Sequence, residues 1–327
     1  LTAKLAELEK LKEFQTYEEI PNEGQEAIST TWVLTEKQEG IKARLTARGF
    51  EEESNVRSDS PTVQSTSMRF LFAVAATKEW KVNTIDIKSA FLQGKTLNRD
   101  VYIQPPKEAN SKGKLWKLFK CLYGLNDASK AWYDEMEARF DKLNFEKSCQ
   151  DSAFFIYKEQ GKIVGIVALH VDDFLFTGTK RFTDVIIPRL LQGLVIGKTE
   201  VGTFTYTGLH VTQEKSGITL DQDEYLANID IPTLEASRLK DSKSMLKPEE
   251  VTVYRQIMGK SNWVIRITRP DLGFDMVSLS SRFHKGTVGD VKEATKVLVK
   301  MQLNKSKIYI PNLNNFEDLE IWCFTDA

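Results

Sequence analysis

Hydrophobic residues recur along the chain at two spacings, and each spacing predicts a different kind of element. At the N-terminus they lie three to four residues apart with charges between them, which predicts an amphipathic helix built on Leu1, Leu5, Leu8, Leu11 and Phe14. A period of two then predicts a β-hairpin from 30–34 and 41–50. Helical spacing returns at 67–76, where we expect the second helix.

The middle of the chain alternates between short buried strands and helices. The predicted strands are 80–87, 101–103, 114–120, 153–157, 163–169, 204–212 and 217–220. The predicted helices are 128–143 and 182–191, and from residue 221 onward the pattern is helical, through 253–267, 271–283 and 291–303. We therefore expect an α+β fold, in which a mixed sheet with helices on one side is followed by a mostly helical lobe.

Composition excludes several classes of protein. The 327 residues include 46 acidic and 45 basic side chains, a net charge of −1, and 41% are hydrophobic, which excludes a disordered tail or a collagen-like rod. The longest apolar run, 163–171, is half of the roughly 18–20 residues that cross a bilayer, so we expect no membrane partner. Three cysteines and three histidines are scattered, which fits neither a disulfide framework nor a zinc site and indicates a reducing, intracellular setting.

Charge is segregated rather than absent. Residues 107–130 hold six lysines against two acids, a net charge of +4, and 282–307 have a net charge of +5. Within the second segment Lys292, Lys296 and Lys300 recur every four residues, a helix stripe suited to nucleic-acid phosphates. An ordinary solvated helix face explains that stripe equally well, and the near-zero net charge of the chain argues mildly against nucleic-acid binding.

Two adjacent carboxylates, Asp172 and Asp173, interrupt an otherwise apolar hairpin. At about 4 Å such charges repel by about 4 kcal/mol at an effective dielectric of 20, so a cation should offset them. A third carboxylate, Asp86, ends another buried strand, and pairing of the strands would bring all three together. Hard oxygen ligands of this kind select Mg²⁺ or Mn²⁺, and two such ions suit in-line phosphoryl transfer. A turn device or a weak calcium site remains the alternative for the Asp pair alone.

Five ordered motifs carry a family resemblance over nearly the whole chain. They are Lys42–Phe50 (KARLTARGF), Val82–Gly94 (VNTIDIKSAFLQG), Lys120–Tyr133 (KCLYGLNDASKAWY), His170–Asp173 (HVDD) and Thr268–Leu272 (TRPDL). Together they resemble the reverse transcriptase of copia-type LTR retrotransposons. The chain thus looks like part of a longer Pol polyprotein whose ribonuclease H and integrase domains are missing or cleaved, with 319–327 as the start of a truncated ribonuclease H domain.

The resemblance implies a right-hand polymerase. It implies an N-terminal helix and fingers in 1–85, a palm with an interleaved fingers segment in 86–220, and a thumb and connection in 221–318. Asp86, Asp172 and Asp173 would be the catalytic and metal-binding triad. Phe91 would exclude a ribose 2′-hydroxyl, and Lys42, Arg44 and Arg48, which share one parity on a predicted strand, would meet the triphosphate. Gln222 and Tyr225 would lie near the primer, with the lysine stripe on primer or template.

Two positions depart from the family pattern. Where the family commonly has Lys-Gln-Ala-Pro in the nucleotide pocket, this chain has Asn126–Ser129, which puts Asp127 near a triphosphate. Asp127 must face a cation, face away or cap the following helix, and we expect the cap. His170 replaces the usual Tyr before Val-Asp-Asp, and we expect it to be a partly buried strand residue.

The leading hypothesis is a Mg²⁺- or Mn²⁺-dependent DNA polymerase. It would use an RNA or DNA template, a DNA or tRNA primer and dNTPs, in the cytoplasm within a virus-like particle or in the nucleus. The alternative is a domesticated protein that binds nucleic acid or assembles with partners without catalysis, for which the triad and Phe91 would be unnecessary. A metal-dependent nuclease would leave Phe91 and the cations of the fingers strand unexplained.

Overall fold

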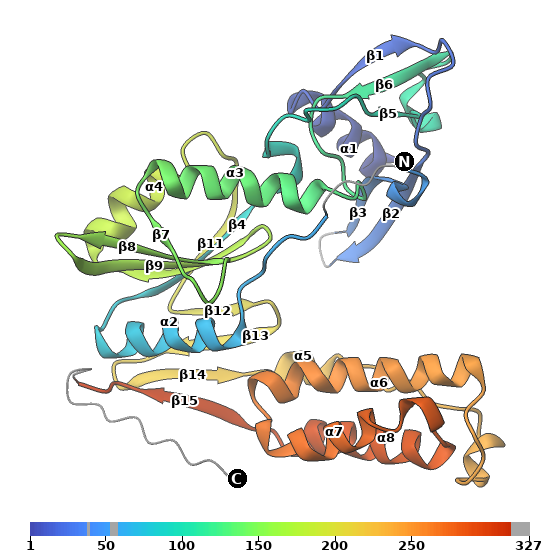
Figure 1. The fold of residues 1–327 in the computed structure, drawn as a ribbon, viewed down its shortest axis with the longest axis vertical. Coiled ribbons are helices and arrows are strands. Elements are labelled where there is room, and N and C mark those ends of the chain that lie inside the picture. The colour runs from blue at the N-terminus through green and yellow to red at the C-terminus, as the bar shows by residue number, and fades with distance from the viewer. Residues whose placement is uncertain (38–39, 53–57, 315–327) are drawn as a thin grey trace. The chain divides into compact units, whose positions relative to one another are not determined.

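A computed structural model describes residues 1–37, 40–52 and 58–314 (Figure 1). The chain forms two compact units, which are described separately. The first comprises Leu1–Gln64 and Ile85–Thr199, and the second comprises Ser65–Thr84 and the chain from Glu200 onward. The predicted start of a ribonuclease H domain at 319–327 lies outside the described residues, and the predicted four-part division stays a prediction.

The N-terminal part of the first unit is a helix packed on small sheets. Its elements are α1 (Thr2–Glu13), β1 (Tyr17–Pro21), β2 (Thr30–Lys37), β3 (Gly40–Ala47), η1 (Gly49–Glu51), η2 (Ala90–Gln93), β5 (Tyr102–Ile103), η3 (Lys107–Ala109) and β6 (Lys114–Leu118). β2 and β3 form the predicted antiparallel hairpin, and β1, β6 and β5 form a three-stranded sheet. Only Leu8 and Leu11 of the predicted stripe are buried on α1, since Leu1 and Leu5 are exposed. The buried face of α1 is therefore narrower than predicted.

The rest of the first unit is built around a six-stranded sheet in the order β11-β4-β10-β9-β8-β7. The strands are β4 (Val82–Ile87), β7 (Glu146–Lys147), β8 (Phe154–Glu159), β9 (Lys162–His170), β10 (Asp173–Gly178) and β11 (Ile196–Val201). β4 and β11 each continue across the boundary into the second unit. Phe140 of α3 (Ala128–Lys142) stacks on Phe155 of β8 at 3.8 Å between ring centroids. This aromatic contact helps to fix the helix on the sheet.

The predicted helix at 182–191 is shorter and less regular than expected. It consists of a π-helical turn, η4 (Phe182–Ile186), followed by α4 (Ile187–Leu190). Pro188 has no amide hydrogen, so the α-helical bond from residue 188 to the carbonyl of residue 184 cannot form. The proline therefore explains why one continuous α-helix does not form here.

The second unit contains a four-stranded antiparallel sheet covered by α2 (Ser65–Thr77). Its strands are β12 (Thr203–Tyr206), β13 (Leu209–Gln213), β14 (Gly217–Asp221) and β15 (Lys307–Pro311), in that order. The predicted single strand 204–212 is wrong, because Thr207 and Gly208 have φ of 49° and 81° and form a two-residue hairpin turn. β11 and β15 were not predicted.

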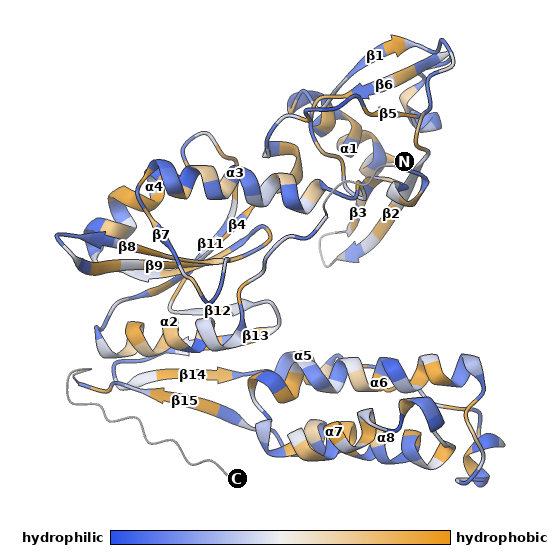
Figure 2. Cartoon of the chain, in the orientation of Figure 1, coloured by the Kyte–Doolittle hydropathy of each residue, from blue (hydrophilic) through white to orange (hydrophobic). Residues whose placement is uncertain are grey.

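Four helices complete the second unit: α5 (Asp223–Ala227), α6 (Pro248–Ile267), α7 (Gly273–Ser280) and α8 (Val288–Leu303). The short turns η5 (Arg238–Lys240), η6 (Pro270–Leu272) and η7 (Phe283–Lys285) connect them. Hydrophobic and hydrophilic residues are mixed along α6 and α8, as expected for helices with one buried face (Figure 2). In the part of the chain that the structure describes, no helix combines the length and hydropathy needed to cross a bilayer.

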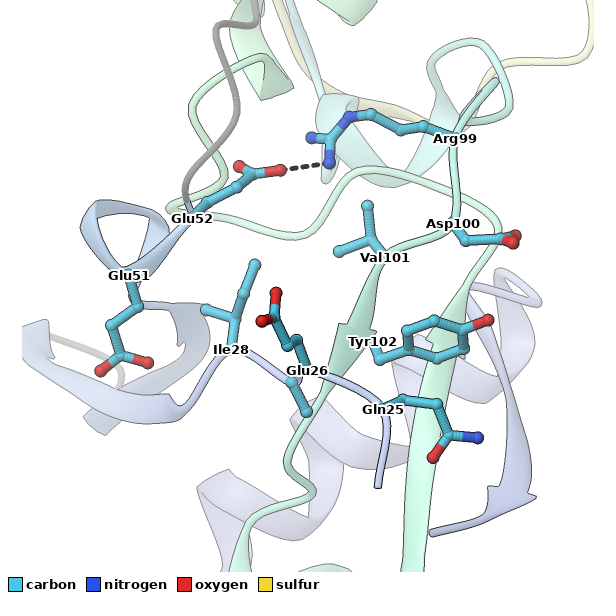
Figure 3. Close-up of a pocket in the computed structure, with 10 residues that line it drawn as sticks. Gln25, Glu26, Ile28, Glu51, Glu52, Arg99, Asp100, Val101 and Tyr102 are labelled. Atoms are coloured by element: carbon cyan, nitrogen blue, oxygen red, sulfur yellow. Dashed lines mark hydrogen bonds and ion pairs between the residues drawn. The ribbon is translucent and has the colours of Figure 1, made fainter. Parts of the chain in front are cut away.

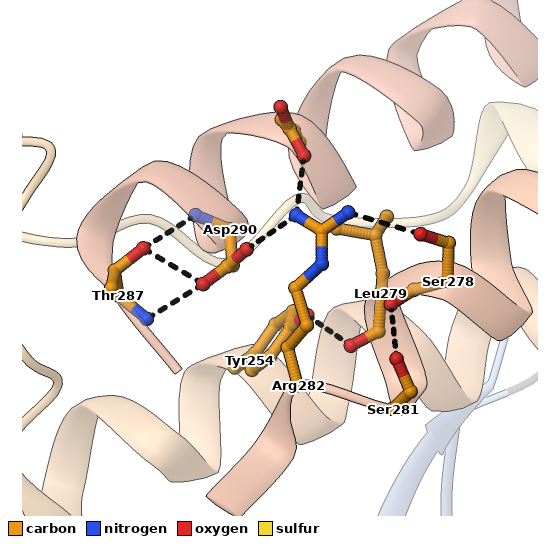
Figure 4. A network of polar contacts seen from close by, with 8 residues as sticks. Tyr254, Ser278, Leu279, Ser281, Arg282, Thr287 and Asp290 are labelled. Atoms are coloured by element: carbon orange, nitrogen blue, oxygen red, sulfur yellow. Dashed lines mark hydrogen bonds and ion pairs between the residues drawn. The ribbon is translucent and has the colours of Figure 1, made fainter. Parts of the chain in front are cut away.

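Polar contacts join α6, α7 and α8 (Figure 4). The Tyr254 hydroxyl donates to the Leu279 carbonyl at 2.7 Å, and Arg282 Nη1 donates to Asp290 Oδ1 at 2.9 Å. Asp290 Oδ2 accepts from Thr287 N and Oγ1, so this carboxylate also caps α8. The buried carboxylate of Asp290 is thus surrounded by hydrogen-bond donors from the chain itself.

Candidate active site

The Asp-Asp pair stands at a tight turn between β9 and β10. His170 and Asp173 are opposite partners in the two strands, so Val171 and Asp172 form the two-residue turn. Val171 has φ of 56°, a left-handed conformation that is unfavourable for a β-branched residue. The carbonyl of Val171 accepts a 2.7 Å hydrogen bond from Trp132 Nε1 of α3. The helix therefore helps to hold the strained tip of the hairpin.

β4 lies beside β10 in the sheet, which brings Asp86 to the hairpin. The backbone N–H of Ile87, the residue after Asp86, donates to the carbonyl of Asp172 at 2.9 Å. The expected pairing of the two Asp-bearing strands is confirmed by this arrangement. All three carboxylates belong to the first unit.

The hairpin carboxylates are in an unfavourable electrostatic setting. Burial, followed by the charges of Asp172 and Asp86, raises the pKa of Asp173 to about 7. Burial also raises the pKa of Asp172, and the charge of Asp86 adds to that shift while His170 and Arg44 oppose it. Asp86 is therefore close enough to both hairpin carboxylates to disfavour their ionisation.

The side chains nevertheless do not form a complete metal site as they stand. Among residues 1–37, 40–52 and 58–314, no group of three or more Asp, Glu, His or Cys side chains is arranged to hold a metal ion. The carboxylate of Asp86 lies against β11, where a Cβ atom placed on Gly197 would be 2.1 Å from Asp86 Oδ2. The predicted three-carboxylate metal cluster therefore stays a prediction.

Aromatic and cationic side chains gather next to the hairpin. Phe91 packs edge-on against Tyr123, with 5.4 Å between ring centroids, and the Arg44 guanidinium lies 5.8 Å from the centroid of the same ring. Burial raises the pKa of the Tyr123 phenol, and Arg44 and Asp172 are both close enough to act on it. No site role was predicted for Tyr123, although it stands inside one of the five motifs. It links Phe91 and Arg44, two of the predicted nucleotide-binding residues.

The three cations of the fingers strand differ in their surroundings. Lys42 is exposed and Arg44 half-buried on one face of β3, alternating with buried Ala43 and Leu45 on the other face. This confirms the predicted parity for these two. Arg48 is exposed just beyond the end of β3, and its Nη1 is 3.9 Å from Glu51 Oε1.

Two glycines fix β3 against the motif that contains Tyr123. The N–H of Ala47 donates to the Tyr123 carbonyl at 2.7 Å, and Asn126 Nδ2 donates to the Gly49 carbonyl at 3.0 Å. A Cβ on Gly124 would lie 2.2 Å from the Ala47 carbonyl oxygen, and one on Gly49 would lie 2.2 Å from the Gly124 oxygen. Only glycine permits this close approach of the two backbones.

The expectation that Asp127 caps helix α3 is wrong. Asp127 occupies the N-cap position, but its side chain makes no capping hydrogen bond. It accepts instead from Arg99, at 2.9 Å from Nη2 and 3.3 Å from Nε. Asp127 therefore faces a cation 28 positions away in sequence, which is the first of the three options.

Arg99 also contacts Glu52, at one side of a cavity of about 840 Å³ (Figure 3). Burial would lower the pKa of Arg99, but its contacts with Asp127 and Glu52 raise it above the ordinary value. The unusual acid of the nucleotide-pocket motif is therefore part of an ion-pair network on the first unit.

The predicted primer and template residues all belong to the second unit. Gln222 is buried, and its Oε1 accepts from Thr268 Oγ1 at 2.8 Å, while Tyr225 lines a nearby cavity of about 330 Å³. Lys292 donates to the Leu239 carbonyl and Ser242 Oγ, whereas Lys296 and Lys300 are exposed on α8. Two of the three lysines therefore present their charge to solvent, and a nucleic-acid role for all five residues stays a prediction.

Comparison with known families identifies the class to which the fold and these motifs belong. A family model described as "Reverse transcriptase (RNA-dependent DNA polymerase)" matches residues 14–250. That is well over half of the chain, so this chain belongs to the reverse transcriptase family. The prediction that the chain belongs to a family of RNA-directed DNA polymerases is confirmed.

Curated relatives show which kind of reverse transcriptase the chain resembles. The chain is 28% identical over 299 residues to the "Retrovirus-related Pol polyprotein from transposon RE1" of Arabidopsis thaliana, covering 83% of this chain and 20% of that one. It is 27% identical over 328 residues to the corresponding polyprotein from transposon TNT 1-94 of Nicotiana tabacum, covering 90% and 24%. The chain therefore spans about a fifth to a quarter of these relatives. The predicted resemblance to a reverse transcriptase domain of a copia-type Pol polyprotein is confirmed.

A solved structure supports the fold. The foamy viral protease-reverse transcriptase dRH in complex with ds DNA matches with a TM-score of 0.53 and 14% identity, over 92% of this chain and 48% of that one. At this identity the likeness concerns the fold alone. It confirms the predicted α+β polymerase fold.

Proposed function

We propose that this chain is the polymerase domain of a retrotransposon reverse transcriptase, which adds dNTPs to a primer 3′-hydroxyl on an RNA or DNA template. The observation that carries the proposal is the backbone hydrogen bond from Ile87 to Asp172, which brings the strand of Asp86 to the hairpin of Asp172 and Asp173. Phe91, Tyr123 and Arg44 lie in the same neighbourhood.

The chemistry of the donor set fits a hard divalent cation. Carboxylate oxygens are the ligands that Mg²⁺ and Mn²⁺ prefer, and the raised pKa values of Asp172 and Asp173 mean that a cation would relieve an existing electrostatic cost. When bound, a pair of such ions would lower the pKa of the primer hydroxyl and neutralise charge on the leaving pyrophosphate. Asp86, Asp172 and Asp173 are the residues that would hold them.

The neighbouring side chains would bind and select the nucleotide. Arg44 and Lys42 supply positive charge from β3 for the triphosphate. Phe91, which Tyr123 supports from one edge, would occupy the space that a ribose 2′-hydroxyl needs. Arg99 pairs with Asp127 and also with Glu52, so it offsets part of the negative charge that the altered motif would bring near the triphosphate.

We further propose an RNA or DNA template and a DNA or tRNA primer as partners, in the cytoplasm within a virus-like particle or in the nucleus. The foamy viral structure with a similar fold is a complex with ds DNA, which supports a duplex as the product. Exposed Lys296 and Lys300 on α8 supply charges for its phosphates.

Primer extension tests the proposal. A labelled DNA primer on an RNA template is incubated with dNTPs and Mg²⁺, with the wild-type chain and with Asp172→Asn. We expect extension by the wild type and a loss on the order of 10³-fold in the variant. Equal extension by both would contradict the proposal. Nucleic-acid binding without any magnesium-dependent extension would favour the non-catalytic alternative.

A further inference from the structure

Asp86 has an unusual neighbour on β11. A Cβ on Gly197 would lie 2.1 Å from Asp86 Oδ2 and 3.2 Å from both Cγ and the backbone oxygen of Asp86. The backbone of Gly197 is not in the left-handed region, so other residues could adopt its conformation. Glycine is therefore needed at this position for space, and the space is taken by the carboxylate of Asp86.

The buried side chain of Gln93 forms hydrogen bonds to residues that flank β4, which carries Asp86, and β11, which carries Gly197. Its Nε2 donates to the Lys88 carbonyl at 2.6 Å and to the Val195 carbonyl at 3.3 Å, and its Oε1 accepts from Val195 N at 2.8 Å. The N–H of Lys88 also donates to the Val195 carbonyl, at 3.1 Å. Lys88 is two residues after Asp86, and Val195 is two residues before Gly197. The Gln93 amide and this backbone bond thus join the chain just beyond the end of β4 to the chain just before β11, beside the carboxylate of Asp86.

We propose that Gly197 and Gln93 are positioning residues for Asp86. Gly197 leaves the space that the carboxylate of Asp86 occupies, and the hydrogen bonds of Gln93 fix the width of that space. The inference rests on the proposed function, in which Asp86 holds a divalent ion. Substitution of residues that orient a metal ligand without contacting the metal typically lowers metal affinity by roughly 10–100-fold.

The test substitutes Gly197 and measures metal binding directly. Gly197→Ala should fold, because the closest clash is with the end of a side chain that can rotate rather than with backbone. We expect Mn²⁺ affinity, measured by calorimetry on the full chain without nucleic acid, to fall by roughly tenfold or more. In primer extension kcat should fall while KM for dNTP changes little, since Asp86 is displaced and the nucleotide contacts remain.

A matched control separates this effect from the general effect of replacing glycine by alanine. Gly273 begins α7 with φ of −61° and ψ of −42°, and a Cβ there would meet only Ile265 Cγ2, at 3.9 Å. Gly273→Ala should leave both Mn²⁺ affinity and primer extension unchanged. Gln93→Met, which keeps the length of the side chain and removes its hydrogen bonds, should also weaken Mn²⁺ binding, by roughly tenfold or more.

A double-mutant cycle tests whether Gly197 acts through Asp86. In an Asp86→Ala background the space is vacant, so adding Gly197→Ala should cause no further loss of Mn²⁺ affinity. A further loss there, or a Gly197→Ala protein that binds Mn²⁺ as tightly as the wild type or more tightly, would overturn the inference. A wild type that binds Mn²⁺ but extends no primer would overturn the proposed function and leave the positioning of Asp86 supported by the binding data.

Discussion

Carboxylates at two places in this chain lie in opposite electrostatic settings. In the second unit Glu250 accepts two hydrogen bonds from Arg238, at 2.6 and 2.9 Å, and one from Lys247 N, and its pKa falls to about 2. At the hairpin of the first unit, burial and two neighbouring carboxylates raise the pKa of Asp173 to about 7.

The electrostatic setting of each carboxylate depends on its neighbours and not on which unit contains it. Asp127, in the first unit like Asp173, is paired with Arg99. At both Asp127 and Glu250 an arginine of the chain compensates the carboxylate. At the hairpin the net effect of the surroundings opposes ionisation, which is the setting expected for acids that receive their cation from outside.

The largest expected effect comes from removing a hairpin charge. Asp173→Asn should reduce primer extension on the order of 10³-fold and yet raise the melting temperature at pH 7 in a metal-free buffer. The sign follows because a carboxyl whose folded pKa is raised destabilises the folded state once the pH exceeds its unfolded value. Calorimetry with EDTA measures the melting temperature, and a lower value for the variant would contradict the contrast with Glu250.

A smaller effect is expected at Phe91, which tests whether the surroundings of the hairpin form a nucleotide pocket. Phe91→Val should reduce the preference for dNTP over rNTP by about 10–100-fold, because the ring would no longer exclude the 2′-hydroxyl. Single-nucleotide incorporation with each substrate gives the ratio. Phe119→Val, at a partly exposed ring outside the site, is the control and should leave the ratio unchanged.

Removing the arginine that pairs with Glu250 should affect stability alone. Arg238→Met leaves Glu250 without its main donor, which should lower the free energy of unfolding. Urea denaturation measures this decrease. Arg189→Met, at an exposed arginine, should stay within about 0.5 kcal/mol of the wild type. Equal values for the two variants would mean that the Arg238–Glu250 pair contributes no stability.

The smallest expected effect is a pH dependence. The folded pKa of Glu250 lies below its ordinary value of 4.5, so its contribution to stability is present above pH 4.5 and is lost as the pH falls towards 2. Glu250→Gln should therefore melt at a lower temperature than the wild type at pH 7, and the gap should narrow between pH 4.5 and 2. A gap that is constant with pH would contradict the lowered pKa.

Local patterns in the sequence predicted most of the elements but not those that depend on a single backbone feature. Strong periodicity was sufficient for the β2–β3 hairpin and for α6 and α8. The turn at Thr207–Gly208 and the irregular helix at Pro188 were missed because one or two residues override the hydrophobic period there. β11 and β15 are largely exposed, so burial leaves little trace in their sequences.

The candidate site shows the same limit. The motifs identified the strands that carry Asp86, Asp172 and Asp173, because each acid interrupts or ends an apolar run. The partners of Asp127 and Asp86 were not predictable, since Arg99 and Gly197 are 28 and 111 positions away in sequence. Such pairs arise only when strands and loops that are distant in the chain fold together.

The most direct test of the central claim is the thermal shift caused by Mn²⁺ in the wild type and in Asp172→Asn. A ligand that binds only the folded state raises the melting temperature, by an amount that depends on its affinity. If the hairpin receives its cation from outside, Mn²⁺ will raise the melting temperature of the wild type and have little effect on the variant. An equal rise in both proteins, or no rise in the wild type, would contradict the account.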